Sequence, residues 1–463
     1  MRSFGAYAAL VAAFAHTGLA VELTITDRAS IQNATSKVAY GLMKYYTGNV
    51  TNTPETIAVL PKPHYWWQAG AMWGILLDYY HYTGDETYNN VTTQALLSQV
   101  GPEFDYMVPL REKEEGNDDQ AFWGFATMAA AEMDYPAPTV GPYSWLQLTE
   151  NLWNTQARRW DTTSCGGGLK WQIFPFNNGY DYKNAVSNGA FFQLSARLAR
   201  FTGNQTYVEW AGRVYDWTKA IGIISDTYDV FDGSDDKINC TELNHITWSY
   251  SNGIFLYGSA VLYNLTNGST IWQERTQGFL ESAKDFFSPF ENSTNVMYEN
   301  ACEPYGTCNV DQFSFKGYLA RFMWKTTLMA AFTASTITTL LETSAQSAAT
   351  ACSGPANGFS NEGETCGQKW YTGDFDGSVG AGQQMSALEV LQGLLISGSV
   401  PPLHQDQVRI NASPTLQVPP VPRDTDATSG SPAPSSPQNA AKGIQPFQIL
   451  AVAGVVGSIL LGL

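Results

Sequence analysis

The chain has 463 residues, of which 44% are hydrophobic and 13% are aromatic, so it can form one large folded domain or two or three ordinary ones. Its formal net charge is -17, and no block of Lys or Arg interrupts this acidity, which argues against nucleic acid as a partner. The 14 Trp, 24 Tyr and 23 Phe residues exceed ordinary usage, and because flat aromatic faces stack on sugar rings, this excess favours carbohydrate as a ligand.

The first segment, residues 1–20, predicts a secretory signal peptide. A lone Arg2 precedes the apolar run AYAALVAAFA, and small residues at Gly18 and Ala20 suit a cleavage site. Nine Asn-x-Ser/Thr sequons beyond this point fit a secreted glycoprotein. They are Asn33, Asn49, Asn90, Asn204, Asn239, Asn264, Asn267, Asn292 and Asn411.

Helical patterns fill residues 21–398, which we expect to form one catalytic domain. We expect helices at 31–46, 65–82, 86–107, 118–133, 143–156, 184–201, 207–220, 250–265, 271–287, 312–332 and 385–395, whereas long runs of alternating Val and Ile are missing. Gly84, Gly203 and Asn267 suit left-handed caps that close one helix before the next begins. This repeated helix–turn–helix pattern predicts an all-α fold. We expect a closed toroid of helix pairs, and an open solenoid is the alternative.

The stretch YWWQAGAMWG at 65–74 places two neighbouring tryptophans at a helix start. We consider Trp66 and Trp67 as sugar contacts, although aromatic clusters at helical spacing are more often core. We expect one of the pair to face into the barrel and the other outward.

The stretch EEGNDDQAFWG at 114–124 has two explanations. Asn117 is a preferred N-cap with Gln120 three residues on, and Asp118 and Asp119 in the first turn complement the helix dipole, so capping alone accounts for every acid. The alternative is an active site with Trp123 beside the carboxylates as a sugar subsite.

Glycosidic cleavage needs one carboxylate to attack or stabilise the sugar carbon and one carboxylic acid to protonate the leaving oxygen. A helix N-terminus helps to keep one Asp ionised, and that charge raises the pKa of its neighbour. Successive helical side chains point about 100° apart, so Asp118 and Asp119 can share a pocket only if their helix end projects into it.

Further candidates for substrate contact lie at later helix starts. Asn184 and Asn188 are four residues apart and could bind sugar hydroxyls or merely cap and solvate their helix. Asp311 is either another N-cap or a ligand, and Lys316 one turn later needs a partner if it is buried. Asn117 completes the set of expected substrate contacts.

The six cysteines predict disulfides, with Cys302–Cys308 and Cys352–Cys366 as local pairs, although six cysteines allow fifteen connectivities. Metal binding is the alternative, but no CxxC or HxxxH spacing accompanies them. Residues 399–445 are rich in Pro and Ser and predict an extended stalk.

The apolar tail at 446–463 ends without a following Lys or Arg, which is typical of a glycosylphosphatidylinositol signal. Asn439 is the expected attachment site, with Ser429 or Gly430 as the fallback, and a tail-anchored transmembrane helix is the alternative. We therefore expect the outer leaflet of the plasma membrane or the cell wall as the location.

Four motifs together resemble glycoside hydrolase family 76, and in particular its fungal cell-wall group. They are GNDDQAFWG, YWWQAGAMWG, the segment at 182–204 and CNVDQFSFKGYLARF at 308–322. The resemblance implies an (α/α)6 barrel and retaining action on α-1,6-mannose linkages, with Asp118 as nucleophile and Asp119 as acid/base. It further implies processing of the mannose-containing core glycan of lipid anchors, with transfer to a β-glucan acceptor.

Two other functions compete with this one. A wall lectin could bind mannan in the same toroid without catalysis, and a terpene-cyclase-like toroid would need a diphosphate or metal pocket that the acid spacing does not favour. The glycosidase mechanism requires no metal or other cofactor, and we expect a monomer.

Overall fold

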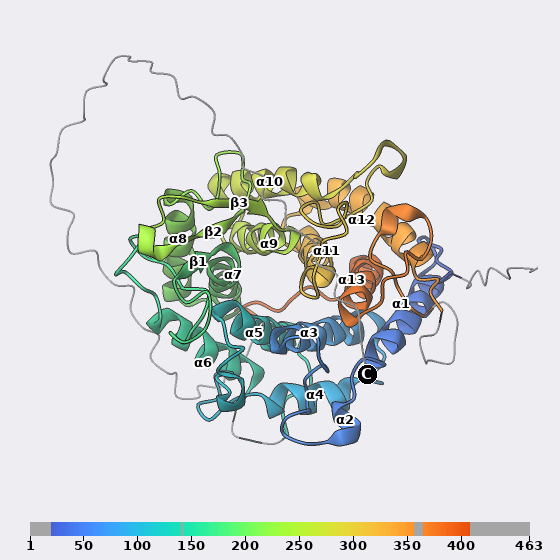
Figure 1. The fold of residues 1–463 in the computed structure, drawn as a ribbon, viewed down its shortest axis with the longest axis horizontal. Coiled ribbons are helices and arrows are strands. Elements are labelled where there is room, and N and C mark those ends of the chain that lie inside the picture. Colours follow the sequence, from blue (N-terminus) through green and yellow to red (C-terminus); the bar gives the residue numbers. More distant parts are fainter. Residues whose placement is uncertain (1–19, 140, 142, 356–363, 408–463) are drawn as a thin grey trace, which may run out of the picture. The chain divides into compact units, whose positions relative to one another are not determined.

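Six long helices form an inner ring in the part of the chain that the structure describes (Figure 1). In ring order they are α3 (Trp66–Thr83), α5 (Asn117–Glu132), α7 (Ala185–Thr202), α9 (Ser249–Leu265), α11 (Gln312–Met329) and α13 (Ala381–Gln392). Each packs against the next, and α13 packs against α3, so the ring is closed. The chain is therefore an (α/α)6 barrel, as the sequence predicted, and the open solenoid is wrong.

An outer helix covers each inner one (Figure 1). These are α1 (Arg28–Met43), α4 (Asn89–Ser98), α6 (Trp145–Arg158), α8 (Gln205–Ala220), α10 (Thr270–Ala283) and α12 (Ala334–Ala351), with the short α2 (Gly48–Thr51) beside them. Outer helices expose one face and inner helices are enclosed; α7 buries every residue from Ala185 to Phe201.

The computed structural model describes residues 20–139, 141, 143–355 and 364–407. These residues all belong to one compact unit. Residues 1–19 of the expected signal peptide, most of the expected stalk, Asn411, Asn439 and the apolar tail lie outside the described residues. No helix among those described combines the length and hydropathy needed to cross a bilayer.

The predicted helix ends are confirmed at the three positions where a left-handed residue was expected. Gly84 caps α3 at φ 75°, Gly203 caps α7 at φ 71°, and Asn267 adopts φ 53° after α9. Of the helix expected at 86–107, only α4 at Asn89–Ser98 forms, and the expected length is wrong because Gly101, Phe104 and Tyr106 take positive φ and turn the chain after α4.

Two features were missed. Helix α12 was not predicted, and neither was the antiparallel sheet β1 (Tyr182–Asn184), β2 (Phe231–Asp235) and β3 (Asn244–Thr247), in which Lys183 pairs with Ser234. The folded unit also continues past the expected boundary at 398, since the Leu403 N–H donates to the Glu132 carbonyl at 2.7 Å.

Buried charges inside the ring are paired between inner helices, as burial of a charge requires. Glu132 of α5 binds Arg197 of α7 at 2.7 Å. Asp78 of α3 binds Arg321 at 2.8 Å and Lys325 at 2.9 Å, both from α11. These pairs tie the later turns of the inner helices together.

Three disulfides join Cys165 to Cys240, Cys302 to Cys308 and Cys352 to Cys366. The two predicted local pairs are confirmed. The long-range pair connects the loop after α6 to the segment between β2 and β3, and so fastens the small sheet to the barrel.

Candidate active site

A cleft of about 950 Å³ opens at the end of the barrel where the inner helices begin. The lining residues from helix starts are Trp67, Asp118, Asp119, Phe122, Asn184, Trp248, Tyr250, Asp311, Gln312 and Phe315. Those from loops and the sheet include Tyr65, Trp171, Gln172, Phe176, Asn177, Asn178, Tyr182 and Asp232. Aromatic walls around carboxylates suit a sugar, with its apolar ring faces and its hydroxyl rim.

Asp118 and Asp119 lie in the first turn of α5 and both line this cleft. The Gly116 N–H donates to Asp119 Oδ2 at 2.9 Å, and the Asp119 N–H donates to Asp118 Oδ1 at 2.9 Å. Asn184 Nδ2 donates to Asp118 Oδ2 at 3.4 Å. The helix end does project into the pocket, so the two carboxylates share it.

The expected capping box is displaced by one residue. The N-cap is Gly116, not Asn117, and the residue that reaches back is Asp119, not Gln120. Gln120 instead donates to the Asp105 carbonyl at 2.8 Å. The capping explanation and the active-site explanation are therefore compatible, because Asp119 caps the helix and lines the cleft.

Burial sets the protonation of this pair. It raises the pKa of Asp118 to about 6, although hydrogen bonds from Asp119 and Asn184 oppose the increase. Burial, followed by the charge of Asp118, raises the pKa of Asp119 well above its ordinary range. Near neutral pH, Asp118 is thus ionised and Asp119 is protonated, which gives the two carboxyl groups different chemical roles.

Trp67 and Asp311 meet in the same cleft. Trp67 Nε1 donates to Asp311 Oδ1 at 3.0 Å, and both side chains line the cleft. Burial, followed by the charge of Asp118 and opposed by the Trp67 bond, raises the pKa of Asp311 to about 6. Asn184 is both N-cap and cleft residue, since its Oδ1 accepts the Ser187 N–H at 3.2 Å.

Four expected substrate contacts do not line the cleft. Trp66 and Trp123 are fully buried and stack with ring centroids 5.2 Å apart, so they belong to the core. Asn117 Nδ2 donates to the Lys170 carbonyl at 2.8 Å, and Asn188 Nδ2 donates to the Leu169 carbonyl at 2.9 Å. Both amides are occupied in holding the same loop, which explains why they are buried.

Several cleft residues were missed by sequence reasoning. Tyr250 and Phe315 stack in parallel, with ring centroids 3.8 Å apart. Asp232 accepts hydrogen bonds from Tyr182 at 2.7 Å and from Trp248 at 3.0 Å. Trp248, Tyr250 and Phe315 share a signal with Asp118, since all lie at the start of an inner helix. Asp232 and Tyr182 come from the unpredicted sheet and carried no such signal.

Lys316 is fully buried and has the partner that it was expected to need. It lies 3.2 Å from Glu303 Oε2, and its ammonium stands 4.0 Å from the ring centroid of Trp370. Among the described residues, no group of three His, Cys, Asp or Glu side chains is arranged to hold a metal ion.

The model of glycosyl hydrolase family 76 matches residues 30–406, which is most of the chain. The chain belongs to this family. It is 50% identical to the mannan endo-1,6-alpha-mannosidase DCW1 of Candida glabrata over 374 residues, which cover 80% of this chain and 81% of that protein. It is 43% identical to the mannan endo-1,6-alpha-mannosidase DFG5 of Saccharomyces cerevisiae, over 84% of this chain and 82% of that protein.

Solved structures agree with this membership. Dfg5 from Chaetomium thermophilum, crystallised in complex with glucosamine, has a TM-score of 0.78 and 39% identity, and the match covers 83% of this chain and 94% of that chain. An inactive variant of the α-1,6-mannanase GH76A of Salegentibacter, in complex with α-1,6-mannotriose, has a TM-score of 0.60 at 17% identity, over 79% of this chain and 99% of that chain. The second likeness concerns the fold alone.

Proposed function

We propose that this protein cleaves α-1,6-mannose linkages with retention of configuration, using Asp118 as nucleophile and Asp119 as acid/base. The observation that carries the proposal is the adjacent pair of buried carboxyl groups in one aromatic cleft, one favoured as ionised and the other as protonated near neutral pH. The names of the relatives, mannan endo-1,6-alpha-mannosidases, supply the substrate class.

In the first step, a carboxylate oxygen of Asp118 forms a bond to the anomeric carbon while the glycosidic bond breaks. The Asp119 proton moves to the leaving oxygen, so the products are a covalent glycosyl-enzyme and a free sugar hydroxyl. In the second step, the Asp119 carboxylate takes a proton from water or from an acceptor hydroxyl, whose oxygen displaces Asp118 from the anomeric carbon.

The proposal extends to transfer. A lipid-anchor core glycan would be the donor and a wall β-glucan the acceptor, and the protein would work on the outer face of the plasma membrane through its own lipid anchor. Dfg5 in complex with glucosamine is consistent with a donor that contains an amino sugar. Nine of the lining residues of the cleft are aromatic, and their flat faces favour a sugar over water beside the glycosyl-enzyme.

Azide with an activated aryl α-mannobioside donor tests the two roles. The variant Asp118→Ala should release a β-mannosyl azide, because azide attacks the donor directly from the face that Asp118 has vacated. The variant Asp119→Ala should release an α-mannosyl azide, because azide intercepts the glycosyl-enzyme. NMR of the products distinguishes the anomers, and exchanged products would reverse the assignment.

Adding a β-glucan oligosaccharide to wild type and following the products by mass spectrometry tests transfer. A new donor–acceptor product that is absent in both variants supports a transglycosidase, whereas free mannooligosaccharide alone means hydrolysis. Binding of the glycan without turnover in wild type would leave a mannan-binding lectin.

A further inference from the structure

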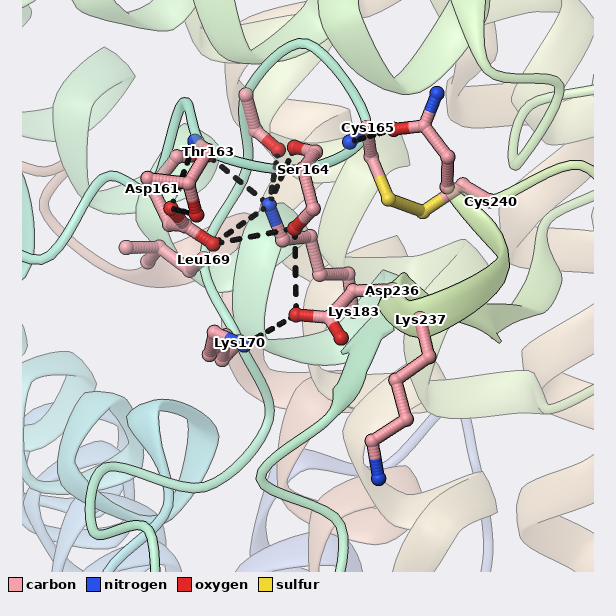
Figure 2. Close-up of polar contacts among 12 residues, drawn as sticks. Asp161, Thr163, Ser164, Cys165, Leu169, Lys170, Lys183, Asp236, Lys237 and Cys240 are labelled. Carbon is pink, nitrogen blue, oxygen red and sulfur yellow. Dashed lines mark hydrogen bonds and ion pairs between the residues drawn. A yellow bond between two sulfur atoms is a disulfide. The ribbon is translucent and has the colours of Figure 1, made fainter.

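Lys183 of β1 is fully buried, and its ammonium is surrounded by oxygen atoms (Figure 2). It donates to the carbonyls of Asp161, Ser164 and Gly167 at 3.0, 2.8 and 2.7 Å, and it lies 3.2 Å from Asp161 Oδ2. All three N–H donors of an ammonium group can therefore be satisfied. Three carbonyls and a carboxylate form the kind of oxygen cage that proteins otherwise build around a metal cation.

The loop that supplies these oxygens has little regular structure of its own. Cys165, Gly166, Gly167 and Gly168 all adopt positive φ, and the segment contains no helix or strand. Carbonyls that converge without a cation repel one another and lose hydration on burial. Asp161 keeps its charge, because hydrogen bonds from Thr163 and the charge of Lys183 outweigh burial and lower its pKa to about 2.

The chain that leaves this loop runs between β1 and residues 116–119, the turn at the start of α5 that carries Asp118 and Asp119 and is called the catalytic turn below. The Trp171 N–H donates to the Tyr182 carbonyl at 2.6 Å on one side. On the other side, the Asn117 N–H donates to the Trp171 carbonyl at 2.8 Å, and Gln172 forms a β-bridge with Gly116. Residues 169–173 are thus hydrogen-bonded to β1 on one side and to the backbone that immediately precedes Asp118 on the other.

Lys183 and its neighbour Asn184 extend from opposite faces of β1, and each is linked to the turn that carries Asp118, Lys183 through the loop and Asn184 directly. Successive side chains of a strand point to opposite faces. Lys183 points into the oxygen cage, whereas Asn184 reaches Asp118 Oδ2 at 3.4 Å. A shift of β1 or of the loop would therefore move the catalytic turn.

We propose that Lys183 is a positioning residue for the catalytic pair, in which its ammonium serves as an internal cation that fixes loop 161–168 and holds residues 169–173 against the turn before Asp118. The kinetic part of this inference rests on the proposed function. The structural part, coupling between the cage and the catalytic turn, does not.

Lys325 offers a matched control. It is also a buried lysine, with an ion pair to Asp78 at 2.9 Å, but it lies near the other end of α11, about 15 Å along the helix from Phe315 in the cleft. The variants Lys183→Met and Lys325→Met both keep an unbranched apolar stem and both lose a buried ammonium. General destabilisation affects the two alike, and positioning of the catalytic pair affects only the first.

Hydrogen–deuterium exchange of the purified full chain tests the coupling without any substrate. Lys183→Met should speed exchange in peptides covering 161–173 and 115–119 and leave exchange in α11 unchanged. Lys325→Met should speed exchange in α11 and leave exchange at 161–173 and 115–119 unchanged. Unchanged exchange at 115–119 in Lys183→Met overturns the proposal. If Lys183→Met does not fold, Asp161→Asn, which keeps Lys183 and removes the carboxylate charge, should loosen the same two segments.

Steady-state kinetics with an α-1,6-mannoside donor supplies the second readout. Per folded molecule, kcat of Lys183→Met should fall on the order of 10²-fold, the cost of a displacement of about 1 Å, with a smaller change in KM. Lys325→Met should keep the wild-type kcat. Equal kcat values for the two variants overturn the proposal, while a wild type without turnover refutes the proposed function and leaves the exchange result to decide the coupling.

Discussion

Asp119 accepts the Gly116 N–H at 2.9 Å, and the two residues approach so closely that a methyl group on Gly116 would lie within 3.0 Å of the carboxylates of both Asp118 and Asp119. Gly116 has an extended backbone, at φ -96°, so it is required for space and not for its conformational freedom. The absence of a side chain at 116 is what lets Asp118 and Asp119 turn back over the start of α5.

The variant Gly116→Ala should therefore lose activity far more than stability. The added methyl pushes both carboxylates from their positions, and we expect kcat/KM to fall on the order of 10²-fold. Gly212→Ala is the control, since an added methyl there meets no atom within 4 Å in the outer helix α8. It should keep wild-type activity, and near-wild-type activity in Gly116→Ala would show that the carboxylates are held by other contacts.

The pH dependence of kcat/KM should be bell-shaped. Activity should rise as Asp118 ionises, with an acid limb near its pKa of about 6, and fall as pH rises through the elevated pKa of Asp119. With an activated donor that needs no proton, Asp119→Asn should retain the acid limb and lose the alkaline one. An alkaline limb that survives in Asp119→Asn would assign the acid to another group.

The same pair should cost stability at neutral pH. The pKa of Asp118 is higher in the folded protein than the ordinary value of 3.8, so the folded state binds this proton more tightly than the unfolded state does. The resulting stabilisation is fully present below pH 3.8 and is lost as pH rises through about 6. Asp118→Asn cannot ionise, so at pH 7 to 8 its free energy of unfolding should exceed that of wild type by on the order of 3 kcal/mol, and its Tm should be correspondingly higher. Thermal unfolding at pH 4 should show little of this difference, and a gain that is equal at both pH values would refute the electrostatic cause.

The fold was largely predictable because helical periodicity and left-handed caps are local signals. Gly84 and Gly203 end their helices as expected, and the pairing of successive helices predicted either a toroid or a solenoid. Closure of the ring depends on the contact between α13 and α3, which lie far apart in sequence. Helix α12 was missed because its sequence, ASTITTLLETSAQSAATA, is rich in Ser and Thr, which have low helix propensity, and its helical state depends on packing against α11 and α13.

The site was predictable where it lies on helix starts and unpredictable elsewhere. Asp118, Asp119, Trp67 and Asp311 were found because each sits at a predicted helix start beside aromatic or acidic residues. Asp232 and Trp171 reach the cleft through strand and bridge pairings with residues far away in sequence, such as Gly116 with Gln172. Such pairings have no local signature, and the same holds for the oxygen cage of Lys183.

Neighbouring tryptophans should respond differently to truncation. Trp66 is fully buried and its Nε1 donates to Gln99 at 3.0 Å, whereas Trp67 lines the cleft and binds Asp311. Trp66→Ala should lose about 3 to 5 kcal/mol of unfolding free energy with little change in KM per folded molecule. Trp67→Ala should raise KM severalfold with a smaller loss of stability. Denaturant unfolding and kinetics on both variants check this, and a Trp66→Ala variant with raised KM would contradict the assignment.

The two adjacent sequons at the end of α9, Asn264 within the helix and Asn267 after it, should differ in occupancy. Asn264 is half-buried; its Oδ1 accepts from Arg200 Nε at 2.8 Å, and its Nδ2 lies 3.5 Å from the Met329 carbonyl. Arg200 in turn donates to the Pro402 carbonyl at 3.1 Å, so a glycan on Asn264 would disrupt the packing of the chain after α13. Asn267, by contrast, is exposed in the turn, and Asn204 is exposed at the start of α8. We expect glycans at Asn267 and Asn204 and none at Asn264, and enzymatic deglycosylation in heavy-oxygen water followed by peptide mass spectrometry reports each site. Full occupancy of Asn264 in active protein would mean that the Arg200 contact is dispensable for folding.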